Sequence, residues 1–377
     1  MEQASISFLE KLCNSFGPSG FEREAIMIVK DYVRSFSDEI VQDKLGSLLF
    51  CKNGSSKEPV IMLPGHVDEI GFVVSAVNEK GFLTFNPLGG WSDQVLLAQR
   101  VLVRTSRGDV LGIIAAKPPH VIPADERKKL LTKKKMFIDI ACSNRREAAE
   151  MGVRVGDPVV PLSNFEIVEK KAFETKDGKE IEKGIQQIAM GKAFDDRVGA
   201  FIAAEVIRRL AAEKLPHPNR VVGAATVQEE VGVRGATTAG WLAEPDVCIT
   251  LEVDISGDVP GIDNNEAPAV MGKGPAISTF DASMIPNQIL KELVINTAER
   301  CGIPYQLSQM AAGGTDAGAV HKQRAGCPSI VLGAPTRHIH SHVAILNLED
   351  VENCIQLVLE LVKVIDKPTA DGFTQVP

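Results

Sequence analysis

The chain has 377 residues, of which 44% are hydrophobic and 24% charged, a composition typical of a globular protein with room for two domains. Its 41 basic and 49 acidic residues give a formal charge of −8, which excludes a global electrostatic attraction to nucleic acid. No apolar stretch reaches the roughly 20 residues that span a bilayer, and the N-terminus lacks the features of a signal peptide. Seven cysteines without a CxxC pair are typical of reduced thiols. We therefore expect a cytoplasmic protein that has neither a membrane nor a nucleic acid as its partner.

The first seventy residues predict two helices followed by β-structure. Apolar residues recur at helical spacing in 7–16 and again in 21–36, and the sequence GPSG between them breaks the pattern. Two β-rich segments follow at 38–53 and 59–74. The second contains the apolar run 60–63, which is typical of a buried strand.

Residues 71–188 show a different sequence pattern. Short strands alternate with glycine and proline turns, and no long amphipathic helix is evident apart from the lysine-rich segment 127–135. This pattern predicts a small β-barrel-like domain inserted into the first fold. Within it, the segment 174–184 predicts an additional hairpin or loop, and the basic run 127–135 is typical of a solvated helix face or a loop.

From residue 189 onward, helical and strand patterns alternate. We expect helices at 194–214, 234–243, 287–302 and 347–367, and strands at 219–227, 246–254, 305–311 and 327–335. This alternation predicts a three-layer α/β sandwich around a mostly parallel sheet, formed jointly by 1–70 and 189–377. In such sheets, ligands bind beyond the carboxyl ends of the strands.

Polar residues gather where the strands of this sheet are expected to end. In chain order, these strand-end residues are His66, Asp68, Glu229, Glu230, Asp254 and His340. Two aspartates, Asp195 and Asp196, also stand at the start of the long helix, where carboxylates commonly cap the first turn. Each pair alone is typical of a surface turn or a cap. Because the strand ends of one sheet meet at one edge, we expect these side chains to converge there.

Histidines and carboxylates without a neighbouring cysteine ligand suit Zn²⁺, Co²⁺ or Mn²⁺. Two such ions roughly 3.5–4 Å apart need one carboxylate shared between them and two further ligands each, five side chains in all. The candidates provide these five ligands and leave one glutamate that does not need to bind a metal. A carboxylate next in sequence to a ligand is held beside the metals without binding one. We therefore expect Glu229 to be the general base, Glu230 to be a ligand, and Asp68 to orient the ring of His66.

Six motifs in this order resemble the signature segments of the M42 glutamyl aminopeptidase family, the tetrahedral (TET) aminopeptidases, of which some are labelled endoglucanase M. These motifs are PGHVDEIGF, AFDDRVGA, VQEEVGVRGA, LEVDIS, GGTDAG and RHIHS. The resemblance covers nearly the whole chain. It implies a dimetal aminopeptidase that acts on peptides and assembles into a homo-oligomer, typically a hollow tetrahedron of twelve subunits.

The resemblance also assigns roles to residues. The implied metal ligands are His66, Asp195, Glu230, Asp254 and His340, with Asp195 bridging two Zn²⁺ or Co²⁺ ions, or Mn²⁺. Glu229 matches the catalytic base and Asp68 the residue that orients His66. Gly314 and Thr315 match a segment that lines the substrate site. By the same analogy, the basic run 127–135 lies in or near a functional loop, where it could face an acidic substrate side chain.

Two alternatives stay open at this point. A glycosidase would use two of the carboxylates without a metal, but aromatic residues for sugar stacking make up only 5% of the chain and the histidines would go unused. A metal-binding scaffold without catalysis would have no need of the carboxylate of Glu229. The preferred N-terminal residue and the native metal do not follow from the sequence.

Overall fold

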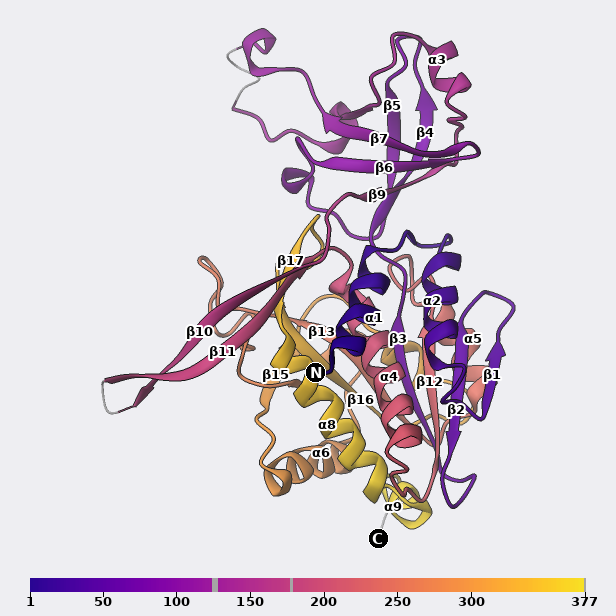
Figure 1. The fold of residues 1–377 in the computed structure, drawn as a ribbon, viewed down its shortest axis with the longest axis vertical. Coiled ribbons are helices and arrows are strands. Elements are labelled where there is room, and N and C mark those ends of the chain that lie inside the picture. The colour runs from indigo at the N-terminus through magenta and orange to yellow at the C-terminus, as the bar shows by residue number, and fades with distance from the viewer. Residues whose placement is uncertain (124–127, 177–178, 376–377) are drawn as a thin grey trace.

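The computed structural model describes residues 1–123, 128–176 and 179–375. Figure 1 shows a large α/β body with a smaller β-domain above it and a long hairpin projecting from one side. None of the helices in these described ranges is both long and apolar enough to cross a membrane. The architecture confirms the predicted α/β sandwich with an inserted β-barrel.

The large body is built on an 11-stranded sheet. Its four central strands run parallel, because β3 pairs in parallel with β12 and β13, and β13 pairs in parallel with β16. The remaining strands extend both edges, largely by antiparallel pairing. In spatial order the main path is β1 (Glu39–Gln42), β2 (Leu48–Asn53), β12 (Arg220–Thr226), β3 (Val60–His66), β13 (Val247–Ile255), β16 (Ser329–Arg337), β17 (Ala344–Asn347), β11 (Lys179–Gly191) and β10 (Glu166–Lys176). Off this path, β14 (Ala276–Asp281) pairs with β16 and with β15 (Gln306–Met310).

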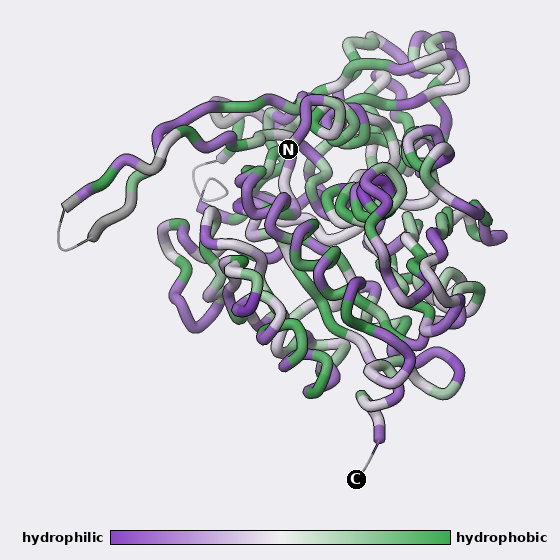
Figure 2. The backbone as a smooth tube through the Cα atoms, turned by 60° about the horizontal axis from the view of Figure 1, so that its bottom comes forward, coloured by the Kyte–Doolittle hydropathy of each residue, from purple (hydrophilic) through white to green (hydrophobic). Residues whose placement is uncertain are grey.

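Helices cover the two faces of the sheet unequally. One face packs on a large core that includes residues of α1 (Gln3–Asn14), α2 (Arg23–Val33), α4 (Phe194–Ala212), α6 (Gln288–Cys301) and α8 (Leu348–Val364). A smaller core on the other face involves α5 (Arg234–Ala243) and α7 (Ala317–Val320). A last helix, α9 (Lys367–Gly372), closes the chain. Figure 2 shows the hydrophobic segments concentrated inside this body.

Side chains alternate between the two faces of the sheet along β3, and this alternation determines the face to which its last residue points. Ile61 and Leu63 belong to the large core, whereas Met62 belongs to the small one. His66 is four residues beyond Met62 and therefore points to the same, thinly covered face. The helices on this face are short, since α5 has 10 residues and α7 has 4.

The inserted domain is a closed barrel with a core of its own around Phe72 and Trp91. Its strands, in order around the barrel, are β4 (Gly71–Val77), β5 (Leu83–Leu88), β8 (Phe137–Asp139), β7 (Gly108–Ala115), β6 (Arg100–Thr105) and β9 (Pro158–Pro161). Short helices connect them: η1 (Asp93–Val95), η2 (Pro119–Val121), η3 (Lys133–Lys135) and α3 (Arg145–Glu150). The described part of the lysine-rich segment is therefore a loop with one short turn, and Arg127 lies outside the described residues.

The hairpin formed by β10 and β11 leaves the barrel and joins the large sheet. Residues 188–191 of β11 pair antiparallel with β17, while the rest of the hairpin projects away from the body (Figure 1). The predicted limits of the inserted domain, 71 and 188, include most of this hairpin and stay a prediction. The strand pairing groups the hairpin with the large sheet.

Candidate functional site

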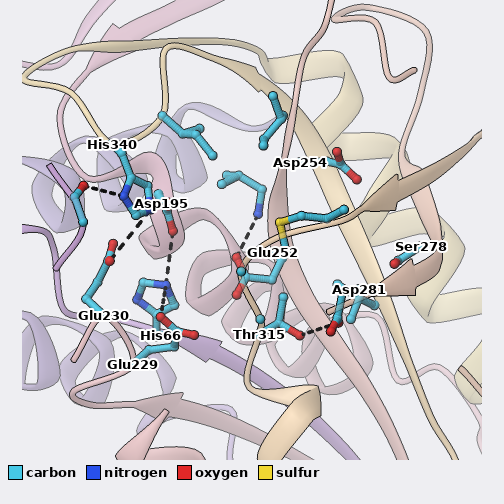
Figure 3. A pocket seen from close by; sticks show the side chains of 18 of the residues that line it. His66, Asp195, Glu229, Glu230, Glu252, Asp254, Ser278, Asp281, Thr315 and His340 are labelled. Carbon is cyan, nitrogen blue, oxygen red and sulfur yellow. Dashed lines mark hydrogen bonds and ion pairs between the residues drawn. The ribbon is translucent and has the colours of Figure 1, made fainter. Parts of the chain in front are cut away.

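The polar strand-end residues meet at one edge of the sheet. His66 is the last residue of β3, and Glu229 and Glu230 follow the end of β12. Asp195 comes from the first turn of α4, and His340 from the loop after β16. Figure 3 shows these five side chains around one end of a cavity of ≈ 580 Å³.

The carboxylate of Asp195 stands between the two histidines. Its Oδ1 lies 3.2 Å from Nε2 of His66, and its Oδ2 lies 3.2 Å from Nε2 of His340. The two glutamates flank this arrangement. Oε2 of Glu229 lies 3.7 Å from Nε2 of His66, and Oε2 of Glu230 lies 3.8 Å from Nε2 of His340. One carboxylate thus joins two imidazoles, each of which also faces a second carboxylate.

Both histidines direct Nε2 into the site because their Nδ1 atoms are engaged elsewhere. Nδ1 of His66 is 3.0 Å from the backbone oxygen of Asp68, and Nδ1 of His340 is 2.6 Å from the backbone oxygen of Gly90. A carbonyl can only accept, so each Nδ1 carries a proton. Each Nε2 faces the carboxylate of Asp195 and would donate its lone pair to a cation once it gives up its own proton. Gly90 belongs to the loop after β5, so the inserted segment supplies part of the support for His340.

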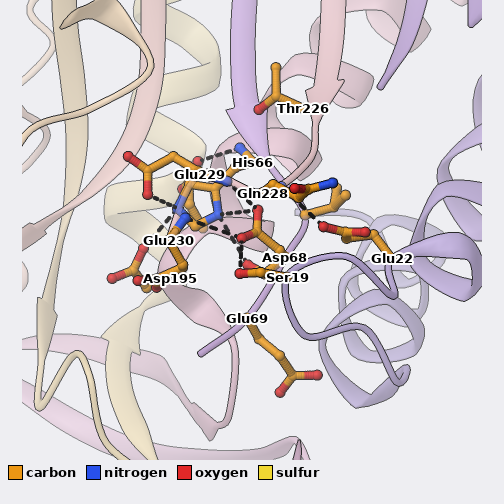
Figure 4. Close-up of polar contacts among 12 residues, drawn as sticks. Ser19, Glu22, His66, Asp68, Glu69, Asp195, Thr226, Gln228, Glu229 and Glu230 are labelled. Atoms are coloured by element: carbon orange, nitrogen blue, oxygen red, sulfur yellow. Dashed lines mark hydrogen bonds and ion pairs between the residues drawn. The ribbon is translucent and has the colours of Figure 1, made fainter. Parts of the chain in front are cut away.

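The carboxylate of Asp68 has a wider role than the sequence indicates. Its Oδ1 lies 3.5 Å from Nδ1 of His66, but the shorter contact to that ring comes from its backbone oxygen. Its two carboxylate oxygens accept the backbone N–H groups of Glu229 at 3.0 Å and Glu230 at 3.1 Å, and the hydroxyl of Ser19 at 2.6 Å. Figure 4 shows Asp68 beside His66 and Ser19, on the other side of the imidazole from the side chains of the glutamate pair.

The turn after β12 explains how neighbouring glutamates reach one site. Gln228 has a φ of 58°, in the left-handed region, so the chain leaves the strand sharply just before the pair. The carboxylate of Glu22 accepts the N–H of Gln228 at 3.0 Å and fixes this turn from the side of α2. The two glutamates therefore sit on a turn with both backbone N–H groups tied down, and their side chains are free to point inward.

Asp196 supports the site from behind. Its Oδ2 accepts the backbone N–H of His66 at 3.1 Å, and its Oδ1 accepts that of Gly199 at 2.9 Å. This contact needs close approach of α4 to β3. A Cβ on Gly65 would lie 2.4 Å from the backbone nitrogen of Ala200. Asp196 is thus a positioning residue whose oxygens are already used.

The structure separates Asp254 from the other predicted ligands. Its Oδ2 accepts the hydroxyl of Ser308 at 2.5 Å, in another part of the cavity. Glu252, two residues earlier on the same face of β13, lies closer to the histidine. Atoms of His66, Asp196 and Glu252 that can bind a metal all lie within 4.8 Å of one another, as do those of His66, Asp195 and Glu230.

Strand register is the signal that would have found Glu252. Cys248 pairs with Met62 in the parallel ladder of β3 and β13, so continuing that register by four residues places Glu252 level with His66. Asp254 lies one pleat beyond. The sequence alone shows where an apolar run ends but not how two strands are aligned, which is why the last carboxylate was predicted instead.

The electrostatics of the site favour added positive charge. Burial raises the pKa of Glu229 to about 8, with His66 opposing this shift and the carboxylates of Asp316 and Asp195 adding to it. Burial likewise raises the pKa of Glu230 and of Glu252 well above their ordinary value. Four carboxylates, those of Asp195, Glu229, Glu230 and Glu252, line one end of the cavity with the two histidines and are costly to ionise together.

The same excess of carboxylates affects the pKa of His340. Burial lowers the pKa of His340, but its hydrogen bond to Asp195 outweighs that effect and raises the pKa to about 10. In addition, Oε1 of Glu230 is buried without a hydrogen-bond partner among the described residues. Two imidazole Nε2 atoms and several carboxylate oxygens form the donor set that Zn²⁺, Co²⁺ and Mn²⁺ prefer. The residues therefore fit a divalent metal site.

The remaining predicted residues line or border the same cavity. Gly314 and Thr315 line it, and the hydroxyl of Thr315 lies 3.4 Å from the carboxylate of Asp281. His338 and His342 flank His340 but stay outside the cluster. His342 is buried against Trp91, with 5.1 Å between ring centroids, and burial lowers its pKa to about 4.

Comparison with known proteins gives a consistent result. A sequence profile described as M42 glutamyl aminopeptidase matches residues 46–357. The chain is 33% identical to the putative aminopeptidase FrvX of Escherichia coli K12 over 98% of both chains. It is 32% identical to the glutamyl aminopeptidase of Lactococcus lactis over 88% of both chains. It is 30% identical to the lysyl aminopeptidase of Pyrococcus furiosus over 94% of this chain and 96% of that one.

Solved structures agree with these relatives. A TET aminopeptidase from a marine sediment archaeon of the Thaumarchaeota is 55% identical, with a TM-score of 0.92 over 98% of this chain and 99% of that one. The TET1 peptidase of Pyrococcus horikoshii, which can assemble into a tetrahedron or a large octahedral shell, is 29% identical, with a TM-score of 0.78 over 96% of this chain and 100% of that one.

Proposed function

The chain belongs to the M42 glutamyl aminopeptidase family, and on this premise we propose that it hydrolyses the N-terminal peptide bond of peptides with the help of two divalent cations. The family is generally metal-dependent, and this chain has matching groups of histidine and carboxylate side chains. The proposed ligands are His66, Asp195, Glu230, Glu252 and His340, with Zn²⁺ or Co²⁺ as the first candidates and Mn²⁺ as a third.

The observation that carries this proposal is the position of Asp195 between two Nε2 atoms, each 3.2 Å from a different carboxylate oxygen. A carboxylate with one oxygen toward each of two histidines is arranged to bridge two cations. When bound, such ions supply a water of lowered pKa and polarise the carbonyl of the scissile bond.

Glu252 takes the place in this ligand set that the sequence assigned to Asp254. It shares a cluster with His66, whereas Asp254 is hydrogen-bonded to Ser308. Asp196 is also in that cluster, but backbone N–H groups occupy both of its oxygens, so it is better suited to hold His66 than to bind a metal.

Glu229 remains the proposed general base. Its side chain lines the cavity and approaches the imidazole of His66 at 3.7 Å, next to the proposed ligands. From there it can take a proton from the attacking water and deliver it to the leaving amine. Asp68 holds the backbone of Glu229 and Glu230 through the two N–H groups described above, so we propose it as a positioning residue for both.

We further propose that the chain assembles into a homo-oligomer. A solved relative, described as a dodecamer, covers 97% of this chain with 28% identity, and the same peptidase can form a tetrahedron or an octahedral shell. Size-exclusion chromatography with light scattering tests this directly. A mass near that of one 40.6 kDa chain would contradict it.

The experiment that tests the function is a turnover screen on aminoacyl arylamides. Protein stripped with a chelator should be inactive, and activity should return after addition of Zn²⁺, Co²⁺ or Mn²⁺. An N-acetylated copy of the best substrate is the matched control, because an aminopeptidase requires the free amine. Equal hydrolysis of both substrates would contradict the proposal.

A further inference from the structure

The cavity that holds the proposed ligands continues past the end of β13 to β14 and β15. Its far end is lined by Asp254, Ser278, Asp281, Ser308 and Met310. Figure 3 shows Asp254, Ser278 and Asp281 on the other side of Glu252 from His340. One continuous cavity thus joins the proposed metal ligands, where the N-terminal bond of a peptide would lie, to this far end.

Two carboxylates in the far end lack a cationic partner among the described residues. Asp254 accepts the hydroxyl of Ser308. Oδ1 of Asp281 accepts the backbone N–H and the hydroxyl of Ser283, each at 2.6 Å, and its Oδ2 accepts the hydroxyl of Thr315 at 3.4 Å. Within the ranges that the structure describes, no lysine or arginine lines the cavity. A buried carboxylate is unfavourable unless it is paired with a cation or saturated with hydrogen bonds. Asp281 is buried with both oxygens hydrogen-bonded, whereas Asp254 has one side-chain donor, Ser308, among the described residues. Asp254 is therefore the carboxylate with room for a cation.

Apolar side chains complete the walls near these carboxylates. Ile255, Met310 and Val331 line the same cavity. Such a wall suits the methylene chain of lysine or arginine, because both side chains lay their stems along apolar surface and keep the charged end with polar groups. A pocket with apolar sides and acidic groups at its end fits an aliphatic cation better than an apolar or an acidic side chain.

We propose that this far end receives the first side chain of the substrate and selects lysine or arginine, with Asp254 as a specificity-determining residue. The inference rests on the proposed aminopeptidase function. Family membership leaves the choice open, because the names of two relatives, a glutamyl and a lysyl aminopeptidase, point to side chains of opposite charge.

The basic run of the barrel does not supply the opposite preference in this subunit. Lys133 pairs with Asp93 at 2.7 Å, and none of the described lysines at 128–135 lines the cavity. Among the described residues, the charge that meets the first side chain therefore comes from carboxylates.

The first test compares lysyl and norleucyl 7-amido-4-methylcoumarin with the metal-loaded enzyme. Norleucine has the methylene chain of lysine without the ammonium group, so the ratio of the two kcat/KM values isolates the effect of the charge. We expect a ratio of at least about tenfold in favour of lysine, and glutamyl substrate below both. Equal or faster turnover of norleucine would overturn the proposal and leave the aminopeptidase function intact. No turnover of any aminoacyl substrate would instead sink the proposed function itself.

The second test is Asp254→Asn, which removes the charge and keeps an oxygen for the Ser308 hydroxyl. It should lower the lysyl-to-norleucyl ratio at least about tenfold while bound metal stays at the wild-type level. Glu252→Gln is the matched control and should lose metal. Loss of metal from Asp254→Asn would make Asp254 a ligand and overturn the assignment. If Asp254→Asn does not fold, Asp281→Asn tests the same ratio, and an unchanged ratio there would count against the acidic pocket.

Discussion

The carboxylate of Asp68 accepts the backbone N–H of Glu229 at 3.0 Å. The same carboxylate holds the next N–H, that of Glu230, so one buried aspartate sets the positions of the proposed base and a proposed ligand together. Asp68 is itself fixed by the hydroxyl of Ser19 at 2.6 Å, which comes from the turn between α1 and α2. The geometry of the glutamate pair therefore depends on a side chain that does not itself line the cavity.

Asp68→Asn should lower kcat about 10- to 100-fold with little change in KM, because the amide places a donor against N–H groups and displaces the turn. Steady-state kinetics on the best aminoacyl substrate measures this split. Ser19→Ala is the milder control, since it removes one hydrogen bond and leaves the carboxylate. A change confined to KM would show that Asp68 acts on substrate binding and not on the position of Glu229.

Glu229→Gln should keep both metals and reduce turnover about 10²- to 10⁴-fold, because an amide cannot carry the proton. Glu230→Gln makes the same change one residue later and should lose metal as well as activity. Metal analysis of the two purified variants, together with kcat, separates the roles. If both variants lost metal equally, the assignment of Glu229 as the base would fail.

A buried ion cluster beneath the site should be important for stability. Glu69 receives Nζ of Lys192 at 2.6 Å and Nη2 of Arg197 at 3.1 Å, and all three side chains are buried. Glu69→Gln leaves two buried cations without their counter-ion and should cost about 3–5 kcal/mol, measured by denaturant unfolding. The same substitution at Glu79, an exposed residue paired with Arg145, should cost at most about 1 kcal/mol. Similar losses from both variants would contradict this account.

Glu22 should make stability depend on pH. Burial raises the pKa of Glu22 to about 7, with the N–H of Gly20 opposing this shift and the carboxylate of Asp68 adding to it. The folded state therefore binds the proton more tightly than the unfolded chain, and the contribution of this group to stability falls as pH rises from about 4.5 to about 7.

Glu22→Gln should remove that dependence. As pH rises from 5 to 8, the melting temperature of the variant should increase relative to that of wild type. The amide is neutral throughout this range and still offers an oxygen to the N–H of Gln228. Scanning calorimetry at several pH values provides the comparison. A difference that stays constant, or that reverses sign, across this range would contradict the raised pKa.

Much of the fold followed from sequence pattern because long apolar periodicities specify their elements directly. The helix predicted at 194–214 is α4, and the strand pattern at 219–227 contains β12. The hairpin of β10 and β11 was harder to place, because its pairing with β17 joins residues more than 150 positions apart. Local pattern contains no information on which sheet a strand joins.

The candidate site, too, could be predicted only in part from local sequence pattern. Adjacent strand ends predicted the meeting of His66, Glu230 and His340, which the structure places around Asp195. The proposal of Glu252 in place of Asp254 as a ligand depends on the register between β3 and β13, which no single strand reveals. The support of His340 by the backbone of Gly90 comes from a distant loop and could not be predicted from spacing.

The central claim is that Asp195 bridges two catalytic cations, and metal analysis combined with activity tests it most directly. Mass spectrometry of the intact wild-type protein, together with chelation and metal add-back, should show about two ions per subunit and turnover that rises with their restoration. Asp195→Asn should bind fewer than two ions and should stay inactive after add-back. Full occupancy in Asp195→Asn, or turnover by wild type that survives complete removal of metal, would contradict the account.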